Sequence, residues 1–104
     1  MNTKTKLLYK TKLVLNSGLV VEVVIWTVIK NKHCTDGMKY RLLLADPLCL
    51  KVLVLLDNHA QKGHHRHDSN GAEYFYDFVS VETLVKDFVK LISIKEELYE
   101  NNEN

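Results

Sequence analysis

Residues 19–30 read LVVEVVIWTVIK, and this stretch decides how the chain folds. Val and Ile dominate it, and their branched side chains fit a pleated sheet better than a helix. Both faces of a strand from Leu19 to Lys30 would be apolar, which predicts a central strand covered on both sides. Glu22 and Trp26 fall on the same face because side chains alternate along a strand. We interpret Trp26 as a core residue.

Further apolar runs on either side of this stretch predict more strands. The run from Lys6 to Leu15 comes before it, and the break at residues 16–18 contains a glycine, as a β-hairpin turn often does. Two later runs, Met38 to Ala45 and Leu48 to Leu56, are separated by a tight turn at Asp46-Pro47. Every connection is short, which favours an antiparallel meander over a parallel sheet.

Near the C-terminus the apolar period changes from strand-like to helical. Apolar residues recur there at spacings of three and four, the stripe of an amphipathic helix: Val81, Leu84, Val85, Phe88 and Ile92. Ser80 can cap the first turn, and Glu82 places a negative charge where the helix dipole favours one. The predicted fold is α+β: a curled antiparallel meander of about four to five strands with one C-terminal helix packed on it. Residues 73–78 are either the fifth strand or an aromatic-rich connection.

The length of 104 residues predicts a single domain over residues 1–104. We expect an ordered core over about residues 5–98, a histidine-rich loop over 57–73 and a frayed tail over 100–104. Cys34 and Cys49 are too isolated to form a disulfide framework. No signal peptide is visible and no apolar run approaches the ~18 residues of a membrane span. These features predict a cytoplasmic protein.

The start of the chain is basic, with four lysines and no acid in residues 1–12. Such a strand can lie along a phosphate backbone. Alternatively, its lysines form the solvated face of an edge strand and discourage aggregation. Both interpretations stay open.

The segment from Asp57 to Asp68 reads DNHAQKGHHRHD and holds four of the chain's five histidines. Polar loops on rigid scaffolds are where binding and catalytic groups concentrate. Lys62 and Arg66 balance the two aspartates, so any basic character of the segment depends on histidine protonation.

This composition suits a ribonuclease that needs no cofactor. RNA scission needs a base for the ribose 2′-hydroxyl, an acid for the leaving 5′-oxygen and fixed positive charge near the phosphate. His65 and His67 can supply the first two, and Lys62 and Arg66 the third. If residues 65–67 are extended, the two imidazoles point to one side and Arg66 to the other.

Two other interpretations compete with the ribonuclease. His65-x-His67 can be a pair of metal ligands, completed by Asp57, His59 or Asp68. Alternatively, the segment is only a solvated turn.

The residues also resemble a known family. Asp57-Asn58, followed by Lys62-Gly63-His64-His65-Arg66-His67, is similar to the D-N…K-G-D-H-R-H signature of the TumE family of toxin–antitoxin toxins. Three other stretches are similar to the family's E-x-x-I-W strand, its K-Y-R strand and the start of its terminal helix: residues 20–26, residues 39–41 and residues 78–88. The matches span about residues 7–92. One position departs from the pattern, because His64 stands where the family has an acid that can orient a neighbouring histidine.

The resemblance implies a cytoplasmic toxin of a type II system, neutralised by a small helix-turn-helix antitoxin, with RNA as its target. With the ribonuclease interpretation, it makes His65 and His67 the acid/base pair, Asp57 the group that orients an imidazole, and Lys62 and Arg66 the phosphate clamps. Four further residues are predicted to bind RNA: Lys39, Tyr40, Arg41 and Asn58. Arg41 can also form an ion pair with Glu22.

Two alternatives to the ribonuclease remain at this stage. One is a non-catalytic module that binds nucleic acid or protein. The other is a metal-dependent hydrolase with the ligands His65, His67, Asp57 and His59. The sequence leaves open the RNA target, its sequence preference, ribosome dependence, metal requirement and whether the chain forms a homodimer. It also leaves open whether His64 inactivates the site.

Overall fold

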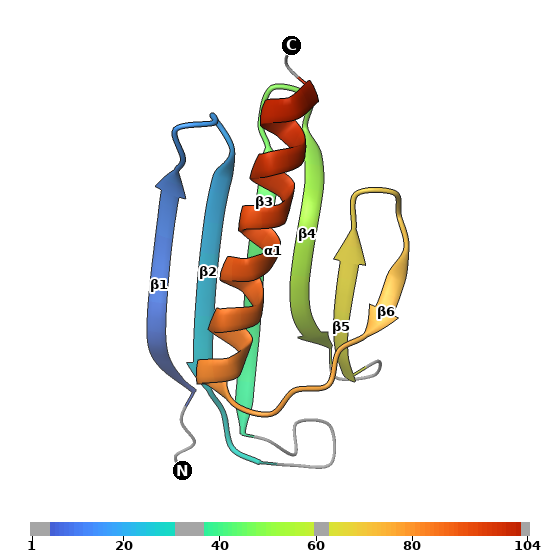
Figure 1. Cartoon of the computed structure of the whole chain (residues 1–104). Helices are drawn as coiled ribbons and strands as arrows, with labels where there is room; N and C mark the ends of the chain where they lie inside the picture. Colours follow the sequence, from blue (N-terminus) through green and yellow to red (C-terminus); the bar gives the residue numbers. More distant parts are fainter. Residues whose placement is uncertain (1–4, 31–36, 60–62, 103–104) are drawn as a thin grey trace.

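The computed structural model describes residues 5–30, 37–59 and 63–102, which form one antiparallel sheet and one helix (Figure 1). The sheet has six strands, and their spatial order follows the chain. They are β1 (Lys6–Val14), β2 (Val20–Thr27), β3 (Met38–Asp46), β4 (Lys51–His59), β5 (Gly63–Asp68) and β6 (Glu73–Phe75). The helix α1 (Val81–Asn102) follows. The predicted α+β meander is confirmed, with a strand count slightly above the predicted one.

The histidine-rich segment is not the loop that we predicted over residues 57–73. β4 continues to His59, and β5 pairs with it so that Asp57 lies opposite His65. β5 lacks an apolar pattern in its sequence. Its strand conformation depends on backbone pairing with β4 and β6. β6 resolves the open alternative at residues 73–78, because residues 73–75 are a strand and the rest is a connection.

The helix begins where the capping pattern predicts. The Thr83 amide donates a hydrogen bond to the Ser80 hydroxyl oxygen over 3.1 Å, so Ser80 is the N-cap. The helix ends at Asn102. Within the described residues, no helix combines the length and apolar character that a membrane crossing needs.

Removing this cap should measurably destabilise the protein. Ser80→Ala is expected to lower the free energy of unfolding by about 1 kcal/mol, because an amide of the first turn loses its acceptor. Urea denaturation followed by circular dichroism measures this change. Ser93→Ala, at an exposed position inside the helix, should leave stability equal or slightly higher. Equal losses in both variants would contradict the capping role.

The helix covers only one face of the sheet, and this arrangement creates two different surfaces. Leu84 and Phe88 are buried against side chains of β2, β3 and β4, including Val23, Leu42 and Leu56. We call this side the helix face. Figure 1 shows α1 crossing diagonally over the middle strands and leaving β1, β5 and β6 uncovered.

The opposite side of the sheet, which we call the open face, carries the alternate residues of each strand, such as Val24 and Arg41. No described residue forms a second layer there. The prediction that the strand at residues 19–30 is covered on both sides is therefore wrong. Trp26 lies half-buried on the open face and not in the core under the helix.

Candidate active site

Strand alternation divides the histidine-rich segment between the two faces. His65 pairs with Asp57 and His67 with Leu55, so both histidines lie on the open face. Arg66 lies between them in sequence and therefore points to the helix face. Residues 65–67 are extended, so the condition stated for their orientation is met and Arg66 lies opposite the two imidazoles.

On the open face, two imidazoles and two carboxylates come together from β4, β5 and β6. The members of this histidine–carboxylate cluster are Asp57, His65, His67 and Glu73. The Nε2 atom of His65 lies 3.3 Å from Glu73 Oε1, and Nε2 of His67 lies 3.6 Å from Asp57 Oδ1. The two imidazole rings are 6.1 Å apart between centroids.

His65 is held in one orientation by its own strand. Its Nδ1 atom lies 3.0 Å from the Gly63 carbonyl oxygen, which can only accept, so Nδ1 carries a proton. Gly63 has a φ of +77°, a left-handed conformation that suits glycine where the chain enters β5. With Nδ1 protonated, a favourable contact between Nε2 and the Glu73 carboxylate requires a second proton. When both nitrogens carry protons, Nε2 of His65 is placed to donate to this carboxylate or to a bound molecule.

His67 has looser contacts than His65. Besides the 3.6 Å contact to Asp57, its Nδ1 atom lies 3.9 Å from Glu73 Oε2. Both separations exceed hydrogen-bond length, so neither ring nitrogen is committed to a carboxylate. About a third of the side chain is exposed. His67 can therefore accept a proton from a bound molecule.

Glu73 is the member of the cluster that we did not predict. It contacts both histidines from the neighbouring strand, where His67 pairs with it directly. The turn before it contains Asn70-Gly71, a pair of residues typical of tight hairpin turns. That signal would have predicted a hairpin at this point, but as a two-residue loop it pairs residue 67 with residue 74. The observed loop has three residues, 69–71, with Gly71 at a φ of +84°, and this loop places residue 73 across from residue 67.

Two basic side chains lie on the open face beside the cluster. Arg41 pairs with Asp57 across β3 and β4, and Lys39 lies two residues away on the same face. Both are exposed. Together with Val24, Trp26 and part of Tyr40, they line a hollow of about 220 Å³.

The predicted pairing of Arg41 with Glu22 does not form among the described residues. Glu22 lies opposite Leu43, whereas Arg41 lies opposite Val24. Arg41 is thus available to bind a phosphate.

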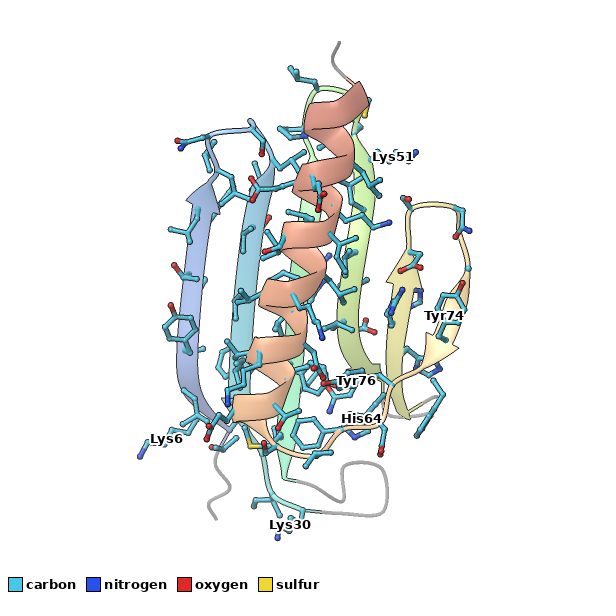
Figure 2. All side chains as sticks on the ribbon, viewed as in Figure 1. Lys6, Lys30, Lys51, His64, Tyr74 and Tyr76 are labelled. Atoms are coloured by element: carbon cyan, nitrogen blue, oxygen red, sulfur yellow. The ribbon has the colours of Figure 1, made fainter. Side chains whose placement is uncertain are left out.

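His64 lies on the helix face, away from the cluster. Its ring stacks on Phe78 with 4.9 Å between centroids, and its Nδ1 atom is 2.7 Å from the Tyr40 hydroxyl. Figure 2 shows His64 beside Tyr76 near the first turns of α1. Because the sheet separates this position from His65 and His67, the departure from the family pattern does not remove a carboxylate from the cluster. Asp57 and Glu73 supply the carboxylates there.

Two of the predicted RNA-binding residues support the sheet from the helix face. Asn58 accepts a hydrogen bond from the Tyr40 amide over 2.9 Å and donates one to the Met38 carbonyl over 2.7 Å. Its side chain thus continues the pairing of β3 with β4 past the last backbone pair at Asp57. Tyr40 is buried and stacks on Phe78.

Arg66 forms a separate network on the helix face. Its guanidinium donates two hydrogen bonds to Asp68, over 2.9 and 3.0 Å, and lies over the Tyr74 ring. These bonds lower the pKa of the Asp68 carboxyl below its usual value. Nearby, burial and then a hydrogen bond to Asp87 raise the pKa of Tyr76. Arg66 does not share a face with the imidazoles that it was predicted to assist.

Two of the predicted site residues lie wholly or partly outside the residues that the structure describes. Lys62 lies outside the described residues, and so does the side chain of His59. Within the residues that the structure describes, no three ligand-type side chains converge closely enough to hold one metal ion.

Comparison with known proteins gives one result. The family model for the toxin TumE matches residues 3–97, most of the chain. Neither the curated proteins nor the solved structures contain a match. A toxin of this kind works in a toxin–antitoxin system and is paired with an antitoxin. The chain therefore belongs to the TumE family and is the toxin component of a toxin–antitoxin system.

Proposed function

We propose that this toxin is a cytoplasmic, metal-independent ribonuclease of a type II system, neutralised by a small helix-turn-helix antitoxin. The observation that carries the proposal is the histidine–carboxylate cluster. It offers one imidazole oriented by Gly63 and Glu73 and a second imidazole whose nitrogens lie beyond hydrogen-bond length of either carboxylate, both on the open face. RNA scission without metal needs this pair of groups.

The cluster supports a specific assignment of acid and base. His67 removes the proton of a ribose 2′-hydroxyl while the 2′-oxygen attacks the adjacent phosphorus. The bond from phosphorus to the 5′-oxygen breaks, and His65 donates its Nε2 proton to that oxygen. The products are a 2′,3′-cyclic phosphate and a free 5′-hydroxyl. Asp57 and Glu73 orient the two rings from the neighbouring strands.

Arg41 is the group best placed to bind the phosphate. It shares the open face with the two imidazoles, and Lys39 adds charge beside it. Since Arg66 points to the helix face, we assign the clamp to Arg41. A guanidinium suits this role because its planar set of donors matches phosphate oxygens. Tyr40 and Asn58 support the strand that carries Arg41.

The test uses the purified chain, a labelled single-stranded RNA and a DNA of the same sequence. We expect the RNA to be shortened in excess chelator, with 2′,3′-cyclic phosphate ends, and the DNA to stay intact because it lacks the 2′-hydroxyl. Binding without shortening would support the non-catalytic alternative. Cleavage only after metal is added would support the metal-dependent hydrolase. Co-expression with the antitoxin should relieve growth inhibition.

Glu73→Gln tests the carboxylate that links the two imidazoles. We expect kcat to fall about 10- to 100-fold, because the His65 ring loses the carboxylate that orients it. The change in KM should be smaller. Steady-state cleavage at varied RNA concentration measures both parameters. Glu97→Gln, on the exposed side of α1, is the matched control. An unchanged kcat in Glu73→Gln would remove Glu73 from the site.

A further inference from the structure

We propose that single-stranded RNA crosses the strands on the open face, with its bases on two aromatic platforms, Phe75 beside the cluster and Trp26 farther along. The inference rests on the proposed function, because it assigns to that site a class of substrate and a binding path. Four observations support it: the exposure of Phe75, the position of Trp26, the spacing between them and the charge of the surface.

Phe75 lies directly beside the histidine–carboxylate cluster. It pairs with His65 across β5 and β6, so its side chain shares the open face with the imidazole. The residue is 77% exposed. Burying an aromatic ring would stabilise the fold by several times the thermal energy, so the fold gains little from Phe75 as it stands. Exposed aromatic rings on a sheet are a common platform for RNA bases, which stack on them whatever their identity. Phe75 is thus placed to hold a base next to the reacting phosphate.

Trp26 lies on the other side of the cluster, in the hollow that it lines with Lys39 and Arg41. Its register partner is Lys39 on β3. An indole ring beside a guanidinium and an ammonium group offers stacking for a base and charge for the adjoining phosphates. Trp26 does not contribute to the core under the helix, where the buried side chains of β2 are Val21, Val23 and Ile25.

The platforms select single-stranded RNA because each must reach the face of a base. A base stacks on a side chain only when that face is free of its neighbours in the strand, which a paired duplex does not allow. Phe75 is one strand from His65, and Trp26 is three strands away on β2. Strands are ~4.8 Å apart, so Trp26 and His65 are separated by about 14 Å or more across the sheet, and a bound RNA must span several nucleotides.

The positive charge on this path lies on the side of Trp26. One row of paired residues crosses the open face from β1 to β6: Lys10, Val24, Arg41, Asp57, His65 and Phe75. Lys10 and Arg41 attract phosphates on the side of Trp26, whereas Asp57 and Glu73 place negative charge at the cluster. The position of Lys10 in this row favours the interpretation that the basic first strand binds phosphates.

The chain has one tryptophan, so its fluorescence reports on Trp26 alone. The probe is a labelled single-stranded RNA of mixed sequence, about 12 nucleotides long, within the range that single-strand-binding domains cover. To prevent cleavage, every ribose carries a 2′-methoxy group. We expect this RNA to quench Trp26 on binding, and a duplex of the same sequence to bind more weakly without quenching. Binding detected through the label without a change in Trp26 emission would overturn the Trp26 platform.

Variants test each platform separately. Trp26→Ala and Phe75→Ala should each weaken RNA binding about tenfold, the effect of losing one stacked base, whereas Trp26→Phe should retain most of the affinity. Tyr74→Ala is the matched control, since Tyr74 is an exposed aromatic residue on β6 that faces the other side. Equal weakening by Tyr74→Ala, or none by Trp26→Ala and Phe75→Ala, would overturn the proposal.

Cleavage assays separate this inference from the proposed function. For Trp26→Ala, kcat/KM should fall for the long unmodified RNA but not for a dinucleotide, which does not reach from His65 to Trp26. Phe75→Ala should affect both substrates. If RNA is cleaved and no platform variant changes kcat/KM, the binding path is wrong and the ribonuclease stands. If the RNA binds through both platforms but is never cleaved, the ribonuclease is wrong and the path stands. Absence of RNA binding would overturn both.

Discussion

His67→Ala is expected to lower kcat for RNA cleavage by about 10²- to 10⁴-fold, the usual contribution of a positioned general base. His65→Ala should cost a similar factor as the general acid is lost. The loss of kcat in the double variant should be smaller than the product of the two single losses, because the effects of residues that act in one step are not additive. Single-turnover cleavage of a labelled RNA measures the chemical step directly. Growth inhibition on expression in cells should disappear in the same variants.

The pH dependence tells the two roles apart. Wild-type kcat/KM should rise and then fall with pH, because one imidazole must be neutral and the other protonated. His67→Ala should lose the decline at acidic pH, and His65→Ala the decline at alkaline pH. The control is His64→Phe, which keeps a ring against Phe78 on the helix face and should cleave like the wild type. If cleavage and toxicity persist in the double variant, the ribonuclease proposal fails.

Phe88→Ala should have the largest effect on stability. Phe88 is 2% exposed and is one of the side chains through which α1 packs on the sheet. Its truncation is expected to lower the free energy of unfolding by about 3–5 kcal/mol, from lost transfer energy and the remaining cavity. Domains of this kind have only about 5–15 kcal/mol in total, so the variant should be partly unfolded and weakly toxic in cells.

Urea denaturation of the purified variants measures this loss. Val89→Ala provides the matched control, because Val89 follows Phe88 in the helix but is 54% exposed. It should change the free energy of unfolding by about 0.5 kcal/mol or less, as surface substitutions usually do. A similar loss in both variants would mean that α1 does not dock through the face that carries Phe88.

Local patterns were enough to predict most of the fold. The branched residues of β2, the glycine turn at residues 16–18 and the helical period after Ser80 each reflect preferences of near neighbours in the chain. β5 escaped prediction because its side chains are polar on both faces, so no apolar alternation marks it. Its strand conformation depends on hydrogen bonds to β4, which are set by pairing between segments.

For the candidate site, the sequence by itself determined that His65 and His67 share one side and Arg66 the other, because side chains alternate along any extended chain. Only the tertiary structure decided that this side is the open face, because that depends on which surface α1 covers. It also brought Asp57 and Glu73 to the imidazoles from two neighbouring strands. Such contacts arise from strand register, which no single segment specifies.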